Sequence, residues 1–147
     1  MLMPGASVAI VMFYAGINAL VALVLALRVV RLRSATKTDL GTGGHRGLEQ
    51  AIRAHGNFIE YAPLILLLLL LLELSGLGAI WLHAMGVALT LGRILHGWGL
   101  STNPGESFGR LSGIFLTWLT LLAALILCIV RGGAALAGLT VPGGLIG

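Results

Sequence analysis

The sequence predicts an all-α integral membrane protein, a single four-helix bundle, and three observations support this. Of 147 residues, 58% are hydrophobic and only 10% are charged. Soluble domains carry about 25% charged residues, so this chain cannot cover a water-facing surface. Four stretches are each long and apolar enough to cross about 30 Å of hydrocarbon. Runs of this length favour helices, because the strands of a membrane barrel are short and alternate in polarity.

Charged residues and glycines separate the four spans. The first span covers about 8–30, and the second covers about 48–74, with an unbroken apolar run over 64–72. A short link at 75–78 leads to the third span, about 79–100. A polar link over 101–107 precedes the fourth, about 109–130. The Gly- and Ala-rich tail, 131–147, is too irregular for a fifth span, so we expect one membrane domain over 1–147.

The few charges indicate topology. Eight of the nine basic residues lie near the two polar links, and only Arg131 lies on the side of the termini. The positive-inside rule therefore predicts that both long loops are cytoplasmic. The single cysteine, Cys128, excludes a disulfide scaffold, and no Cys or His spacing suits a metal, so we expect no metal site. So few basic residues also argue against a nucleic-acid partner.

The second span begins with a polar stripe. Offsets of four, four and three residues place four side chains on one helix face: Glu49, Arg53, Asn57 and Glu60. Glu49 and Arg53 have an alternative interpretation, as interfacial residues that reach toward water. Glu60 does not, because it lies about 16 Å along the helix from Glu49. A carboxylate at that depth should face a bundle interior, a partner subunit or a water-filled cleft.

Other spans bring polar residues to the same membrane side. Arg93 and His96 share a face of the third span, Arg110 begins the fourth, and Arg31 follows the first. A cationic cluster with one internal carboxylate suits a small anionic ligand that also carries an ammonium group. The alternative is an Arg–Glu network that only locks the helices together.

The segment 53–63 reads Arg-Ala-x-x-Asn-x-x-Glu-Tyr-x-Pro, and here the chain resembles the MAPEG family, the membrane-associated proteins of eicosanoid and glutathione metabolism. The resemblance extends to Gly92-Arg93-x-x-His96 and to Arg110-Leu111, over roughly residues 8–130. It implies a homotrimer of four-helix subunits that binds glutathione, as co-substrate, between subunits near the cytoplasmic face. Family members use the glutathione thiol on lipophilic substrates.

The resemblance also implies roles for individual residues. It makes Arg110 the catalytic residue that stabilises the thiolate. It implies glutathione binding by a further set of side chains: Arg31, Arg53, Asn57, Glu60, Tyr61, Arg93 and His96. Leu100 stands where the eicosanoid enzymes carry a tyrosine, which favours a general glutathione transferase or peroxidase.

Two other functions remain open from the sequence. One is a non-catalytic member of this family whose polar cluster is structural or binds another anionic metabolite. The other, a small transporter, is weaker, because no span is broken by paired Gly or Pro at mid-membrane. The Ala-, Gly- and Leu-rich composition with short loops favours a bacterial inner membrane over the endoplasmic reticulum.

Overall fold

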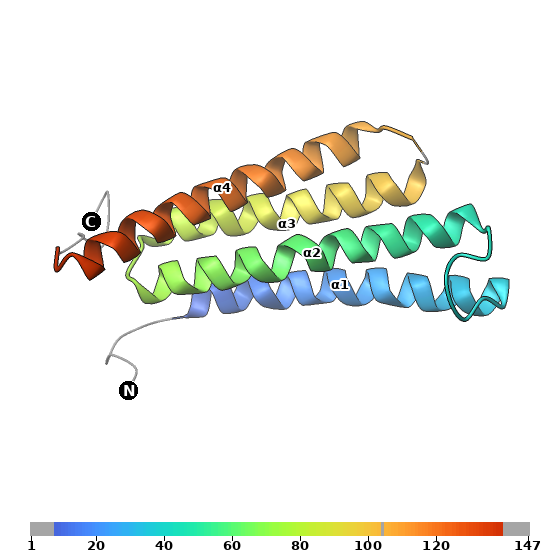
Figure 1. The fold of residues 1–147 in the computed structure, drawn as a ribbon, viewed down its shortest axis with the longest axis horizontal. Coiled ribbons are helices and arrows are strands. Elements are labelled where there is room, and N and C mark those ends of the chain that lie inside the picture. Colours follow the sequence, from blue (N-terminus) through green and yellow to red (C-terminus); the bar gives the residue numbers. More distant parts are fainter. Residues whose placement is uncertain (1–7, 104, 140–147) are drawn as a thin grey trace.

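The computed structural model describes residues 8–103 and 105–139, and these form four long helices that run along one axis (Figure 1). The helices are α1 (Ala9–Thr36), α2 (Arg46–Leu74), α3 (Ala79–Thr102) and α4 (Phe108–Leu136). All four are long and apolar enough to cross a membrane. The predicted all-α fold and the four spans are therefore confirmed. The helices exceed the predicted spans chiefly at two ends, since α1 continues past residue 30 and α4 past residue 130.

That extension at α4 changes the predicted tail. Residues 131–136, which we expected to lie outside the last span, form the final turns of α4. Glycine disfavours a helix by only about 1 kcal/mol per residue, and the alanines and leucine around Gly132 and Gly133 are strong helix formers. Residues 140–147 of the predicted tail lie outside the described part of the chain.

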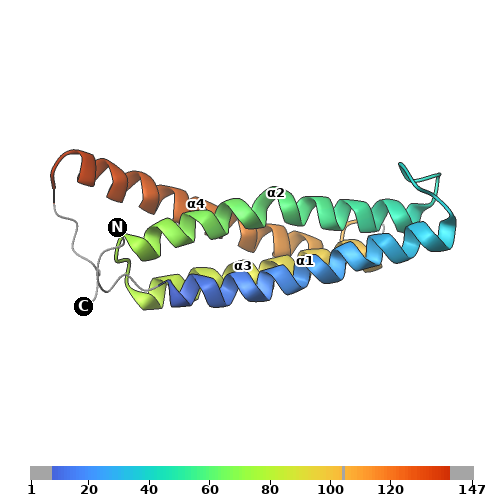
Figure 2. The ribbon, with the colours of Figure 1, turned by 90° about the horizontal axis from the view of Figure 1, so that it is seen from below.

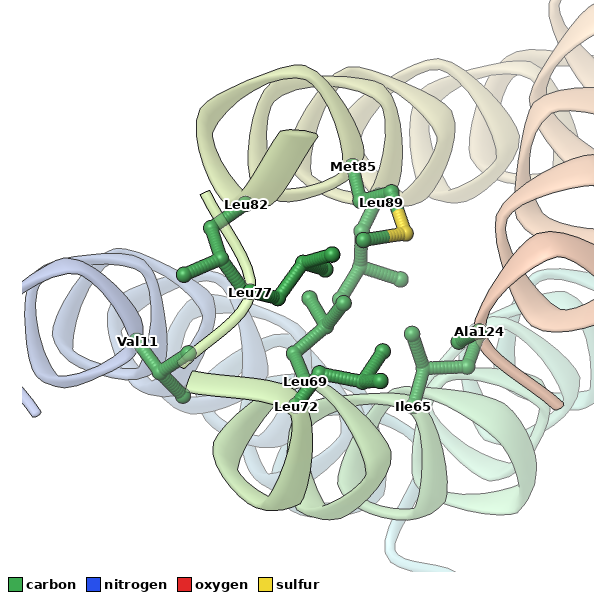
Figure 3. Close-up of a cluster of buried hydrophobic side chains, with 9 residues drawn as sticks. All are labelled: Val11, Ile65, Leu69, Leu72, Leu77, Leu82, Met85, Leu89 and Ala124. Atoms are coloured by element: carbon green, nitrogen blue, oxygen red, sulfur yellow. The ribbon is translucent and has the colours of Figure 1, made fainter. Parts of the chain in front are cut away.

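The core lies between α2 and α3, and α1 and α4 each add side chains to it (Figure 3). Buried aliphatic side chains from α2 and α3, including Leu69 and Leu89, point toward Val11 of α1 and Ala124 of α4. Within the described helices α1 and α4 do not touch, so α2 and α3 form the centre of the bundle. The side chains on the outer faces remain exposed and apolar, as lipid contact requires.

A buried carboxylate fixes α1 against α2. Glu73, near the end of α2, accepts hydrogen bonds from the backbone N–H groups of Ile10 and Val11, at 3.0 and 2.8 Å. These N–H groups belong to the first turn of α1 and have no partner within that helix. No local sequence pattern indicates this role of Glu73, because its partners are backbone groups more than sixty residues away.

Helices α3 and α4 are close at one end and diverge at the other (Figure 2). The close end, which we call the loop end, contains the connections 37–45 and 103–107. Here a Cβ atom on Gly113 would lie 2.6 Å from the carbonyl oxygen of Gly92, and one on Gly99 would lie 2.9 Å from the backbone of Gly109. Only glycines permit this approach, and it brings polar residues of α3 and α4 together.

Candidate functional site

A polar cavity of about 420 Å³ lies between α2, α3 and α4 at the loop end. It is lined by eight residues, five of them from the first three turns of α2: Arg46, Glu49, Gln50, Arg53, Asn57, His96, Leu100 and Arg110. Three guanidinium groups thus surround one carboxylate. An anion is attracted to such a site, and the carboxylate adds a place for a cationic group.

Local structure explains how α2 presents this face. Arg33 donates hydrogen bonds from Nη1 to the carbonyl oxygens of Thr38, Asp39 and Gly41, so the connection folds back on the end of α1. Glycines with positive φ at 41, 43 and 44 then turn the chain into α2. The turn places Arg46, the first residue of α2, at the rim of the cavity.

Arg93 lies behind the cavity and holds Asn57 in place. Its side chain is only 1% exposed. Its Nη1 donates to the side-chain oxygen of Asn57 at 2.9 Å and to the backbone oxygen at 3.1 Å. The guanidinium carbon lies 5.9 Å from the ring centroid of Tyr61, a cation–π distance. Arg93 therefore supports the cavity wall, and its partner Asn57 is the residue of the pair that lines the cavity.

The other wall joins α3 to α4. The Nδ1 atom of His96 lies 3.1 Å from the carbonyl oxygen of Arg110. Ser107 caps α4 by accepting from the backbone N–H of Arg110, and the Arg110 side chain donates from Nη1 to the carbonyl oxygen of Gly105 at 2.6 Å. These contacts fix Arg110 at the start of α4, with its side chain on the cavity.

Comparison with known proteins agrees with the motifs at this site. The sequence profile of the MAPEG family matches residues 11–130, which include every residue that lines the cavity. The chain belongs to the MAPEG family. It is also similar to the inner membrane protein YecN of Escherichia coli K12, with 37% identity over 109 residues, 74% of this chain and 82% of YecN. YecN of the E. coli strain O6:H1 matches equally.

The structure brings together only part of the site predicted for this MAPEG protein. Of the predicted residues, four line one cavity: Arg53, Asn57, His96 and Arg110. Tyr61 is half-buried against Arg93. Neither Arg31 nor Glu60 lines the cavity, and both are exposed on the surface of the single chain. Within one chain, the predicted contact of these two residues with a ligand in the cavity is not formed.

Four cavity residues lie outside the predicted site: Arg46, Glu49, Gln50 and Leu100. For Arg46 and Gln50 a signal existed in the sequence. Arg46 and Gln50 precede Arg53 and Asn57 at offsets of four, three and four residues, so all four share one face of α2. Gln50 is informative because its Nε2 is buried and has no hydrogen-bond partner among the described residues. Such an orphaned donor costs about 1–3 kcal/mol, which a bound acceptor would recover. An amide or carboxylate oxygen of a ligand suits this position.

Proposed function

We propose that this protein is a membrane-embedded glutathione transferase, with glutathione peroxidase activity as the related possibility. The observation that carries the proposal is the composition of the cavity. Glutathione has two carboxylates, an ammonium group, two amide bonds and a thiol. Three arginines, one glutamate and the orphaned amide of Gln50 complement these groups. Within one chain, Glu49 is the carboxylate available to the ammonium group.

Arg110 has the role of activating the thiol. A thiol is a weak nucleophile until it loses its proton, and a guanidinium in a partly desolvated site favours the anion. With an aryl chloride such as chlorodinitrobenzene, the thiol proton goes to water. The sulfur then forms a bond to the ring carbon, and chloride leaves. Binding both reactants in one site removes much of the entropic cost of their encounter.

The assembly that we propose is a homotrimer. Glu60 lies midway along α2 and is exposed, and no hydrogen bond to its carboxylate is found within residues 8–103 and 105–139. A charged group at the bilayer centre costs about 2.5–3.5 kcal/mol. A neighbouring copy that covers this face removes the cost and brings Glu60 and Arg31 to a site between subunits.

For the membrane, we propose a bacterial inner membrane with both long loops cytoplasmic. The relative YecN is described as an inner membrane protein. Eight of the nine basic residues lie in the half of the bundle that contains the loop end. The positive-inside rule assigns such a side to the cytoplasm.

The test of the function compares two arginine variants in detergent. Arg110→Ala should lower kcat/KM for glutathione and chlorodinitrobenzene by about a hundredfold, the scale seen when one group that stabilises an anionic reacting atom is removed. Glutathione binding should weaken far less, because other cationic groups remain. Arg131→Ala, at the opposite end of the bundle, is the matched control and should retain the rate. If glutathione neither binds in calorimetry nor raises the melting temperature of the wild-type protein, the proposal is wrong.

One observation favours a second candidate, a non-catalytic member of the family. The Arg93–Asn57 contact is buried and joins α2 to α3. A polar network that serves only to hold the helices together would contain the same contact. In that case Glu60→Gln lowers the stability of the assembly equally with and without glutathione. A glutathione-binding protein instead loses more stability in the presence of the ligand.

A further inference from the structure

A second concave site lies on the opposite side of α3, between α1 and α3. This α1–α3 groove has a volume of about 420 Å³ and is lined by α1 from Leu20 to Arg28 and by α3 from Arg93 to Ser101. It shares no lining residue with the glutathione cavity. A ligand in the groove therefore does not contact the residues that line the cavity, although Arg93 of the groove holds Asn57 of the cavity.

The groove is apolar along most of its length. Leu20 and Val24 on α1 and Ile94 on α3 line it, and each of these side chains is at least 45% exposed. Gly97 adds no side chain to the floor, and a Cβ there would only reach ordinary contact with Leu25. From Leu20 to Arg28 the groove extends about 12 Å along the membrane normal, enough to hold a segment of an acyl chain.

The loop end of the groove is cationic. Arg28 is half-buried and donates from Nη2 to the carbonyl oxygen of Ser101 at 2.9 Å, in the last turn of α3. Its Nε and Nη1 have no hydrogen-bond partner within the described chain, so they remain available for an oxyanion. Trp98, 62% exposed, lies beside it on the groove. Arginine and tryptophan together are typical of the level of lipid headgroups.

We propose that the α1–α3 groove binds one anionic phospholipid. The phosphate lies on Arg28 beside Trp98, and one acyl chain follows Leu20, Val24 and Ile94. Charge and shape together select this occupant. The available N–H groups of Arg28 lie at one end of an apolar groove, so an anionic headgroup joined to an acyl chain complements both parts.

The experiment uses Trp98 as a reporter in bilayers. In a Trp81→Phe/Trp118→Phe background Trp98 is the remaining tryptophan. Its fluorescence is measured in vesicles with equal mole fractions of phosphatidylglycerol and phosphatidylcholine, in which only one of the two lipids has brominated chains. We expect phosphatidylglycerol to occupy the position beside Trp98 with about fivefold preference over phosphatidylcholine, so its brominated form should quench more strongly. This preference is the effect of one guanidinium near a membrane surface.

Variants separate the groove from general attraction to a basic surface. Arg28→Gln should abolish the preference, Arg28→Lys should retain most of it, and Val24→Phe should remove it by filling the groove. The matched controls are Arg31→Gln, on the same helix outside the groove, and Leu122→Phe on the exposed face of α4. Both should keep the preference.

Three results would overturn the proposal. Equal quenching by the two lipids would show that Trp98 contacts only bulk lipid. Weak quenching by both would show that a second copy covers the groove. An equal loss in Arg31→Gln and Arg28→Gln would show non-specific attraction. Arg28→Lys and Val24→Phe keep the test valid if Arg28→Gln fails to fold.

Discussion

At the scale of single residues, Arg93 is held by the helix that faces it. The family resemblance implied that Arg93 lies near the carboxylates of glutathione or supports them. In the structure its buried side chain donates to Asn57 and lies against Tyr61. A guanidinium inside a membrane bundle needs acceptors, and the side chain and carbonyl of Asn57 supply two on the facing helix.

The Arg93–Asn57 contact gives the first structural prediction. Arg93→Met should destabilise the protein by about 1–3 kcal/mol, because it leaves the Asn57 oxygen unpaired. It should also weaken glutathione binding, since Asn57 is then free to turn. In a double-mutant cycle with Asn57→Ala, measured by calorimetry, the two losses in binding should overlap strongly. Additive losses would mean that Arg93 contacts the ligand itself.

At the scale of helices, Glu73 joins the start of α1 to the end of α2. Glu73→Ala should lower the free energy of unfolding by about 1–2 kcal/mol, the value of a helix cap with a favourable charge. The free energy of unfolding of Glu73→Gln should lie between those of the wild type and Glu73→Ala, because an amide has a single acceptor oxygen for two N–H donors. Thermal unfolding in detergent measures both.

The exposed Glu106 provides the control for this helix cap. Glu106→Gln should change the free energy of unfolding by no more than about 0.5 kcal/mol. If Glu73→Gln and Glu73→Ala also stay within that range, the cap does not stabilise α1.

The close approach of α3 and α4 gives a second prediction at this scale. A Cβ on Gly113 would overlap the backbone of His96 and Gly92, so Gly113→Ala should push α4 away and cost about 1–3 kcal/mol. Since His96 and Arg110 stand on opposite sides of this contact, the rate with glutathione should fall as well. Activity and melting temperature are measured together.

The control is a glycine in the same helix with open space around it. A Cβ on Gly133 meets nothing within 4 Å, so Gly133→Ala should leave activity unchanged and stabilise the helix by up to about 1 kcal/mol. If Gly113→Ala and Gly133→Ala change activity and melting temperature equally, the close contact between α3 and α4 is not the reason for the loss in Gly113→Ala.

At the scale of the whole molecule, the exposed Glu60 predicts association. The test is a Glu60→Cys/Cys128→Ser variant, which has one thiol on the outer face of α2. Oxidative crosslinking in membranes should produce linked chains, and native mass spectrometry of the wild type should give a trimer. A thiol at Val87, on the exposed face of α3, is the control and should crosslink less. A protein that is monomeric by both methods would exclude a site between subunits.

The sequence alone determined the membrane class, the four helices and the family, because these depend on apolar length and on local motifs such as residues 53–63. Helical periodicity also placed Arg53 and Asn57 on one face of α2, and in the structure both line the cavity with His96 and Arg110. Only the tertiary structure decided that Arg93 supports Asn57, that Glu73 caps α1, and that Arg31 and Glu60 lie outside the cavity of one chain. Those outcomes depend on which helices are neighbours and how closely they approach, and neither is encoded in the spacing along a single helix.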